Sequence, residues 1–502
     1  MSITRREFFH ETLAALGFLS LPGGVLFAAP PDWKPDKVPN LVFGILSDTH
    51  LRTANRGNGH GANWPDKHLV AALKYFKSRN VDAVAHCGDM AHRGQVRELE
   101  FHAEAWRKVF ADGHAPVKLF VTGNHDVEGA GYGDFVKKRY PDPAVRAKHI
   151  LSTNMAENWE RIWGEKYEPV WHKVVKGYHF FGRNWDAPES AAVAKLGLFA
   201  KDTNVPSTAT DERKPVPSHP FFYFQHTRPS GNVRNGLLQR EGGVAFFGHN
   251  HWSISNWNMA YLYNNRLPVI ECASCEPRGC SALVGDAWIT KVPIGGREAT
   301  GKGRQGYVVR IYDDMMVIER HEFTNEESSL GEDWVMPLGK YDPHPFSKDE
   351  LKKVIGEPQF RAGAELTTEM FQAETQKNTE ENPGTQTNED SSSLCLRVRI
   401  PYADGNQKSR VYAYEIVVAG ERKQTFPTVE NSPQENTRPG KLRKAVYAAG
   451  CNMGIGHKPN GGITELIIPK SELPSGKTLT VAVRPLTSLG TFGKAIATEF
   501  QV

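Results

Sequence analysis

The stretch "VAFFGHNH", residues 244–251, runs from a short apolar segment through a glycine into two histidines that are separated by one asparagine. A short apolar run that stops at a glycine is typical of a buried strand. In an extended chain, residues i and i+2 project to the same side, so His249 and His251 point together and Asn250 points away. Alone, the pair fits metal ligands and ordinary loop histidines equally well. The ends of the other apolar runs distinguish these interpretations.

Four more apolar runs end in polar residues of the same kind. The runs cover residues 41–47, 81–87, 117–122 and 221–225, and the residues that follow them are Asp48-Thr49-His50, Gly88-Asp89, Gly123-Asn124-His125-Asp126 and His226. In α/β sheets, ligands bind beyond the carboxyl ends of the strands. We therefore expect the polar ends of all these predicted strands to meet at one rim.

The segments between the strands predict an α/β domain. Residues 65–78 and 95–110 are expected to be helices, and Leu69, Leu73 and Phe76 recur at helical spacing in the first of them. Strands that alternate with helices of this length indicate βαβ units. Further strands are predicted over 177–182 and 268–273. Residues 306–323 are typical of a hairpin that turns at Asp313-Asp314 and closes a domain covering residues 38–338.

The polar strand ends have the chemistry of a metal site. They offer carboxylate and amide oxygens and imidazole nitrogens but no thiolate, a set that suits manganese, iron or zinc. These donors are numerous enough for two divalent ions if one carboxylate is shared between them. The glycines before Asp89, Asn124 and His249 let the backbone turn sharply and approach an ion closely.

Taken as a set, the motifs D-x-H, G-D, G-N-H-D, H and G-H-x-H over residues 48–251 resemble the signature of the calcineurin-like metallophosphoesterase superfamily. The resemblance implies a four-layer αββα sandwich with a dinuclear metal centre. It implies that one ion is held by Asp48, His50, Asp89 and His251. The other ion is then held by Asp89, Asn124, His226 and His249, with Asp89 as the bridge.

The resemblance also implies a metal-dependent phosphoric ester hydrolase, a phosphatase or phosphodiesterase, whose substrate is a small phosphate mono- or diester attacked by a hydroxide that the two ions share. His125 matches the histidine that faces the substrate, and Asp126 matches the carboxylate that orients it and holds it cationic. His125 is then expected to stabilise the phosphate oxygens or to protonate the leaving group.

Two more residues are candidates for substrate contacts. His92 stands three residues after Asp89, where purple acid phosphatases have a tyrosine, so a coloured iron–tyrosinate centre is not expected. An ordinary position near a helix N-terminus is an equally good interpretation of His92. Arg228 follows His226 by two residues and has the bidentate geometry for a phosphate. A solvated loop charge is the preferred interpretation of Arg228.

Length, composition and charge limit the domain count and the function classes that are compatible with the sequence. The chain has 502 residues, 39% hydrophobic and 24% charged, with a net charge of +4 from 61 basic and 57 acidic residues. This length predicts two or three domains. A nuclease or cyclic-nucleotide phosphodiesterase of the same superfamily is an alternative, but the balanced charge gives no basic stripe and predicts no specific nucleic-acid partner. No apolar stretch reaches the roughly 18–20 residues of a membrane span.

The N-terminus predicts export. Thr4-Arg5-Arg6-Glu7-Phe8 precedes an apolar stretch that ends at Ala28 and Ala29, and residues 1–29 resemble a twin-arginine signal. An amphipathic helix is the alternative. The expected location is therefore the periplasm or the cell exterior.

The cysteines are expected to be structural in an exported protein. For Cys272, Cys275 and Cys280, a local disulfide or buried thiols are favoured over zinc, and Cys395 and Cys451 are candidates for a second pair.

Residues 345–502 are predicted to form a separate β domain. Short β-like runs cover 394–400, 410–419, 478–486 and 495–500, which is the pattern of a small all-β sandwich. A first strand over 358–371 would place the polar segment 372–393 in a loop of that sandwich. The tail resembles the last strands of a fibronectin type III-like module. The alternative from another functional class is a binding protein that contacts a cell surface or polymer through this domain. The His125–Asp126 pair argues against this alternative, because a purely structural metal site would not need these two residues.

Overall fold

The computed structural model describes the chain with gaps, over residues 38–53, 66–129, 135–201, 220–251, 254, 260–264, 267–275, 294–295, 304–313, 315–323, 327–330, 333–338, 356–373, 393–404, 411–420, 441–448, 462–487 and 491–502. The predicted signal over 1–29, Cys280, Cys451 and all but the ends of the polar segment 372–393 lie outside these residues. None of the described helices has the length and apolarity needed to cross a bilayer.

The first sheet contains three of the predicted metal-bearing strands. Strands β1 (Leu41–Leu46), β2 (Ala83–Cys87) and β3 (Val117–Val121) pair in parallel, and β1 also pairs with β11 (Gln305–Ile311) in antiparallel fashion. Strand β11 forms the expected hairpin with β12 (Met315–Glu322). The sheet continues beyond the hairpin, because β13 (Ser328–Ser329) and β14 (Trp334–Pro337) also pair with β12.

The remaining metal-bearing strands belong to a second sheet. Its order is β4-β5-β6-β7-β9-β8, and β5, β6, β7 and β9 run parallel. The bounds are β4 (Val170–Val175), β5 (Tyr178–Arg183), β6 (Phe221–Phe224), β7 (Gly243–Phe247), β8 (Ala260–Tyr263) and β9 (Leu267–Glu271). The expected rim of strand ends is thus shared by two sheets.

Aromatic side chains fill the space between the sheets. The ring of Phe43 on β1 meets the rings of Phe180, Phe222, Phe224 and Phe246 edge-on, with centroids 4.9–6.4 Å apart. All of these rings are fully buried. Burial of this much apolar surface is the main force that holds two sheets face to face, and it fixes the distance between their carboxyl ends.

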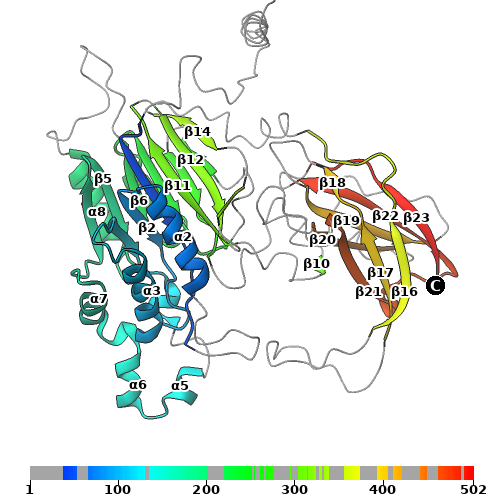
Figure 1. The fold of residues 1–502 in the computed structure, drawn as a ribbon, viewed down its shortest axis with the longest axis horizontal. Coiled ribbons are helices and arrows are strands. Elements are labelled where there is room, and N and C mark those ends of the chain that lie inside the picture. Colours follow the sequence, from blue (N-terminus) through cyan, green and yellow to red (C-terminus); the bar gives the residue numbers. More distant parts are fainter. Residues whose placement is uncertain are drawn as a thin grey trace, which may run out of the picture.

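Helices cover the outer sides of the two sheets, as Figure 1 shows. Leu73 and Phe76 of α2 share one core cluster with residues of α3, α7 and the first sheet, whereas α8 and α9 share another with the second sheet. The helices are α2 (Asp66–Ser78), α3 (Val96–Val109), α4 (Asn124–Val127), α5 (Phe135–Arg139), α6 (Pro143–His149), α7 (Met155–Trp163), α8 (Glu189–Lys201) and α9 (Gly231–Leu237), with a 3₁₀ turn η2 (Leu151–Asn154).

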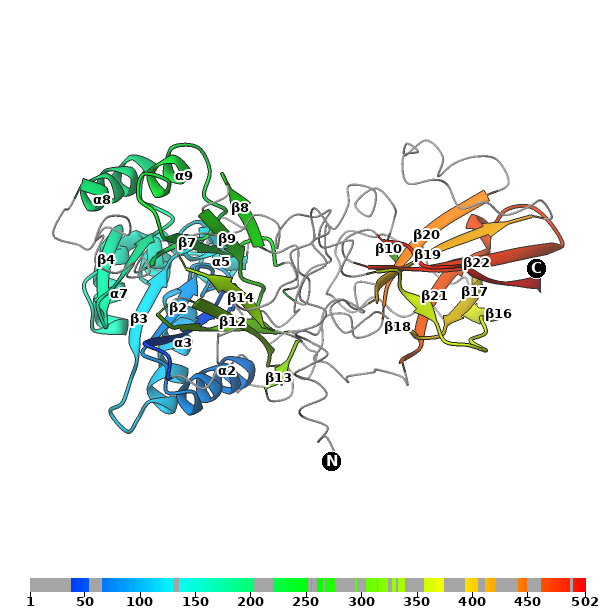
Figure 2. The ribbon, with the colours of Figure 1, turned by 90° about the horizontal axis from the view of Figure 1, so that it is seen from above.

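The C-terminal part is built from strands, and no α-helix occurs in its described residues (Figure 2). One sheet has the order β10-β20-β19-β22-β23, another β16-β17-β21, and β15 pairs with β18. The bounds are β10 (Ile294–Gly295), β15 (Gln359–Phe360), β16 (Thr367–Ala373), β17 (Ser393–Ile400), β18 (Ala403–Asp404), β19 (Val411–Ala419), β20 (Lys441–Tyr447), β21 (Thr464–Pro469), β22 (Thr478–Thr487) and β23 (Ile496–Gln501), with a 3₁₀ turn η9 (Lys470–Glu472). The strand predicted over 358–371 is therefore divided into β15 and β16.

Candidate metal centre

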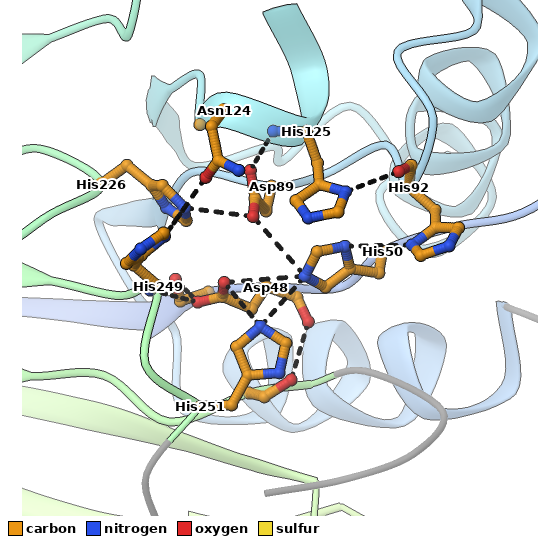
Figure 3. Close-up of polar contacts among 12 residues, drawn as sticks. Asp48, His50, Asp89, His92, Asn124, His125, His226, His249 and His251 are labelled. Carbon is orange, nitrogen blue, oxygen red and sulfur yellow. Dashed lines mark hydrogen bonds and ion pairs between the residues drawn. The ribbon is translucent and has the colours of Figure 1, made fainter. Parts of the chain in front are cut away.

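The carboxyl ends of strands from both sheets bring seven of the predicted residues into one cluster, which Figure 3 shows in close-up. Three triads of ligand atoms, each with its atoms within 4.8 Å of one another, occur in this cluster; one consists of His50, His92 and His125, and the other two each contain a carboxylate. Of these two, the first triad is Asp48, His50 and His251. The second is Asp89, His226 and His249. The division between the triads matches the division between ions that the sequence motifs imply.

The atoms of the first triad converge on one point. The Nε2 atom of His251 lies 3.0 Å from Oδ1 of Asp48 and 3.0 Å from Nε2 of His50. Oδ1 of Asp48 is buried and faces Nε2 of His251 at 3.0 Å and Nε2 of His50 at 3.7 Å. A buried carboxylate oxygen that faces two imidazole nitrogens is a donor set that fits a divalent cation.

The second triad gains an amide oxygen. Nε2 of His226 lies 3.1 Å from Oδ2 of Asp89 and 3.2 Å from Nδ1 of His249, which in turn is 3.2 Å from Oδ1 of Asn124. Oδ2 of Asp89 also lies 3.5 Å from Nε2 of His50, a member of the first triad. One carboxylate oxygen therefore reaches both triads, and the arrangement is compatible with two divalent ions that share Asp89.

Hydrogen bonds with neighbouring groups hold several of these side chains in place. Nδ1 of His226 donates to the carbonyl of Cys87 at 2.8 Å, which leaves Nε2 as the electron-pair donor. Oδ2 of Asp48 accepts hydrogen bonds from the hydroxyl of Ser47 at 2.5 Å and from the backbone of His249 at 3.0 Å. The backbone N–H of His125 donates to Oδ1 of Asp89 at 2.8 Å, so Oδ2 of Asp89 remains directed at the ligands.

The backbone at the ligands is strained. Five of the predicted ligands have φ values between 44° and 78°, in the left-handed region that non-glycine residues rarely adopt: Asp48, His50, Asp89, His249 and His251. Such strain costs on the order of 1–3 kcal/mol per residue and is concentrated at functional sites. Bound cations would stabilise these conformations by coordinating the side chains that the strain positions.

All three glycines predicted to permit close approach, Gly88, Gly123 and Gly248, do so. A Cβ atom on Gly123 would lie 2.2 Å from Oδ1 of Asp89, and one on Gly248 would lie 1.9 Å from the hydroxyl oxygen of Ser47. Gly88 has a φ of 95°, and a Cβ atom there would meet Nδ1 of His226 at 2.6 Å. At these three positions any side chain would displace a ligand or its support.

The ionised carboxylates of the cluster favour the binding of cations. Burial opposes ionisation of Asp48, but the neighbouring His251 outweighs it and keeps the pKa of Asp48 well below its ordinary value. Burial likewise opposes the charged form of Asp89, and His226 reverses the effect, so that the pKa of Asp89 is also lowered. Asp89 in turn raises the pKa of His226 to about 9 against the effect of burial. Two ionised carboxylates in a buried cluster require positive partners.

His125 lies in the cluster, but its orienting partner differs from the predicted one. Its Nδ1 donates to the backbone carbonyl of His92 at 2.7 Å. The carboxylate of Asp126 instead accepts hydrogen bonds from the backbone of Gly123 at 2.8 Å, Ala91 at 2.7 Å and Met90 at 3.3 Å. Asp126 thus links the G-N-H-D turn to the loop after β2.

The protonation of His125 responds to burial and to the neighbouring side chains. Burial, followed by the nearby His50, lowers the pKa of His125. Burial and the charge of Asp89 raise the pKa of Asp126 to about 7. A backbone carbonyl orients the ring of His125 without adding a negative charge to the site.

The two candidate substrate-contact residues lie in different places. His92 is partly buried, its Nδ1 lies 3.4 Å from Nδ1 of His50, and its ring stacks on that of His125 at 5.4 Å. His92 thus supports two members of the cluster. Arg228 is exposed, and its guanidinium lies over the ring of Tyr263 at 5.7 Å. Asn250 points toward Glu271, with 3.3 Å between its Nδ2 and Oε2 of that residue.

Sequence reasoning missed two residues beside the cluster. Ser47 was read only as the last residue of a strand, although it directly precedes Asp48. Trp185 follows β5, a strand that was predicted but whose end was not considered, and its ring centroid lies 6.0 Å from that of His226 and 6.4 Å from that of His249. Treating the end of every parallel strand as part of the rim would have found Trp185.

One family of known proteins matches part of the chain. Residues 41–253 match the family model of the calcineurin-like phosphoesterases. No curated protein matches the chain. Among solved structures, a dimetal phosphatase from Danio rerio is 12% identical, with a TM-score of 0.30, over 61% of this chain and 100% of its own. The purple acid phosphatase PPD1 from yellow lupin seeds is 12% identical, with a TM-score of 0.35, over 61% and 56% of the two chains.

Proposed function

We propose that this metal-dependent phosphoester hydrolase, whose residues 41–253 form a calcineurin-like phosphoesterase domain, hydrolyses small phosphate mono- or diesters with two divalent ions. The observation that carries the proposal is the position of Oδ2 of Asp89 between the two ligand triads. The packing of helices outside two facing sheets supports the four-layer αββα arrangement for this domain.

The donor set indicates which ions are suitable. Carboxylate, amide and imidazole donors without a thiolate favour manganese, iron or zinc. When bound, such ions neutralise phosphate charge and lower the pKa of a water molecule. The first ion would be held by Asp48, His50, Asp89 and His251. The second would be held by Asp89, Asn124, His226 and His249.

His125 supplies the proton chemistry of the chain itself. Because its Nδ1–H is engaged by the carbonyl of His92, proton exchange takes place at Nε2, on the part of the ring that faces the ligands in Figure 3. A lowered pKa makes the protonated ring a stronger acid, so the fraction of His125 that has taken up a proton from solvent at Nε2 donates it to the leaving alkoxide. The stacked ring of His92 keeps His125 in this orientation.

Turnover of two model substrates tests the proposal. The full chain, loaded with Mn²⁺, is assayed on p-nitrophenyl phosphate and on bis-p-nitrophenyl phosphate, and the assay is repeated after chelation. We expect hydrolysis that chelation abolishes and added metal restores. A preference for the diester would support the phosphodiesterase or nuclease branch. Absence of turnover of either substrate by the metal-loaded protein would contradict the proposal and favour a binding protein.

We further propose that the chain is exported by the twin-arginine route to the periplasm or cell exterior, and that its C-terminal β-sandwich, fibronectin type III-like, contacts a cell surface or polymer. The motif around Arg5 and Arg6 supports export. Because that route carries folded proteins, the metals would be loaded before export. Replacing both arginines by lysine should retain the protein, metal included, in the cytoplasm. Export of the double variant at the wild-type level would contradict the route.

A further inference from the structure

The end of β5 contributes a sixth strand end to the rim, and its backbone is tied to a metal-ligand loop. The backbone N–H of Thr122 donates to Oδ1 of Asn184 at 2.7 Å. The backbone N–H of Trp185 donates to the hydroxyl of Thr122 at 3.0 Å. Thr122 stands immediately before Gly123 and the predicted ligand Asn124. Trp185 is therefore positioned by the same turn that positions a ligand.

The indole of Trp185 is fixed in its plane as well. Its Nε1 donates to Oε1 of Glu128 at 2.7 Å, at the end of the short helix that begins with Asn124. The ring lies nearly parallel to that of His249, at an interplanar angle of 23°, and edge-on to that of His226, at 76°. Trp185 is only partly buried, and His249 is exposed.

A rigid, partly exposed indole beside the second ligand triad is an apolar surface in an otherwise polar site. Flat aromatic groups stack on such a surface, and stacking contributes to binding without selecting particular hydrogen-bond patterns. A phosphate held at the two triads would place its ester group within reach of the walls of the site, and Trp185 is the aromatic wall on the side of His226 and His249.

We propose that Trp185 is a stacking platform for the leaving group and that the preferred substrates are phosphoesters of planar aromatic groups. This inference rests on the proposed phosphoesterase function. The shared chemistry is a flat aromatic ring on the alcohol side of the ester, whether that ring is an aryl group or the base of a nucleotide. Trp185 acts here on substrate preference, whereas His125 acts on the reacting atoms.

The ratio of two specificity constants tests the platform. We compare kcat/KM for phenyl phosphate with kcat/KM for glycerol phosphate in the metal-loaded wild type, Trp185→Ala and Trp185→Phe. Loss of one aromatic stacking contact predicts that Trp185→Ala lowers this ratio about 3- to 10-fold. Trp185→Phe keeps an aromatic face and should restore most of the ratio. Glu128→Ala, which removes the anchor of the indole, should lower it by a smaller factor.

Binding of phosphonates, which have no ester bond to hydrolyse, gives a second readout. Calorimetric titration with phenylphosphonate and methylphosphonate should show tighter binding of the phenyl compound, and Trp185→Ala should reduce the difference by a similar factor. Adenosine monophosphate is the third substrate: faster turnover than phenyl phosphate identifies a nucleotide base as the stacking group, and slower turnover identifies an aryl group.

The outcomes separate this inference from the function on which it rests. If the wild type hydrolyses both esters and neither the ratio nor the phosphonate preference changes in Trp185→Ala, the platform is refuted and the phosphoesterase stands. If the metal-loaded wild type hydrolyses neither ester, the proposed function fails. A phenyl preference in phosphonate binding that disappears in Trp185→Ala would then still support an aromatic subsite.

Discussion

Asp89 is the residue on which both ligand triads depend, and its two oxygens have different tasks. Oδ2 lies between His50 and His226, while Oδ1 accepts the backbone N–H of His125. Asp48, by contrast, belongs to the first triad alone. We predict that purified Asp89→Ala loses both ions, whereas Asp48→Ala retains close to one ion per chain. Elemental analysis of the purified variants measures this directly. Two ions in Asp89→Ala would exclude a bridging role.

The proposed role of His125 is catalytic without being that of a ligand, so its removal should separate turnover from metal binding. General acid–base catalysis by one side chain is worth about 10²- to 10⁴-fold in rate. We predict a fall of kcat of that size in His125→Ala, with the metal content unchanged. The comparison requires kcat and elemental analysis on the same preparation. A metal-loaded variant with wild-type turnover would rule out the role.

At the scale of single elements, the end of β7 is packed against the end of β1 through Gly248. A Cβ atom there would lie 1.9 Å from the hydroxyl oxygen of Ser47 and 2.4 Å from Oδ2 of Asp48. We predict that Gly248→Ala lowers the free energy of unfolding by about 1–3 kcal/mol, as overpacking does. It should also weaken metal binding, because Asp48 must move.

Gly197, in α8, is the matched control for Gly248. The nearest atom to a Cβ there is Oε1 of Gln239 at 3.8 Å, so the methyl group fits. Alanine in a helix interior is favoured over glycine, and Gly197→Ala should stabilise the protein by about 0.4–1 kcal/mol. Denaturant unfolding of both variants tests the pair. Equal effects of the same sign would show that the contact at Gly248 is not the cause.

The contact between α2 and β12 makes stability depend on pH. His321 on β12 lies 3.1 Å from Glu319 and 2.5 Å from Glu327, and Glu319 pairs with Arg79 at the end of α2 at 2.7 Å. Burial opposes the charge on His321, but the hydrogen bonds that its ring donates to Glu319 and Glu327 prevail and raise its pKa. A histidine whose pKa is raised on folding stabilises the protein below its unfolded pKa of about 6.5.

That stabilisation is lost as the pH rises through the folded pKa of His321. We predict that the melting temperature of the wild type falls relative to that of His321→Gln as the pH is raised from about 6 upward. Subtracting the curve of the variant removes the contributions of the other groups. A constant difference between the two curves across this range would contradict a charged His321.

At the scale of the whole molecule, the sequence predicts which candidate ligands gather at the rim, because most of them directly follow an apolar strand. Asp48, Asp89, Asn124, His226 and His249 all lie where a strand end places them. Strand patterning alone does not show that two sheets share the rim, because it does not tell which strands pair; only the family resemblance, through the αββα sandwich that it implies, pointed to two sheets. Asp126 was expected to orient His125, whereas the hydrogen bonds that it accepts come from backbone amides, which leave no mark in the sequence.

The C-terminal strands show a second limit. Strand β20 was not predicted, since its sequence "KLRKAVY" looks polar. In the structure, Arg443 of β20 and Arg484 of β22 both pair with Glu415 of β19, each at 2.5 Å, and Glu415 is fully buried. A charge buried with its partners breaks the usual alternation of apolar and polar residues, and the partners are too distant in sequence to be recognised.

Because the ligands come from both sheets, bound ions join two layers of the same domain. Ions that bind only the folded state stabilise it by about 2.7 kcal/mol at a free concentration 100-fold above Kd. They also act on left-handed backbone at Asp48, His50, Asp89, His249 and His251. We therefore predict that chelation lowers the melting temperature of the wild type by several degrees, and that Mn²⁺ restores it. Asp89→Ala, in which both ion sites are broken, should melt at the same temperature with and without chelator. A chelator effect as large in Asp89→Ala as in the wild type would place the stabilising ions outside this centre.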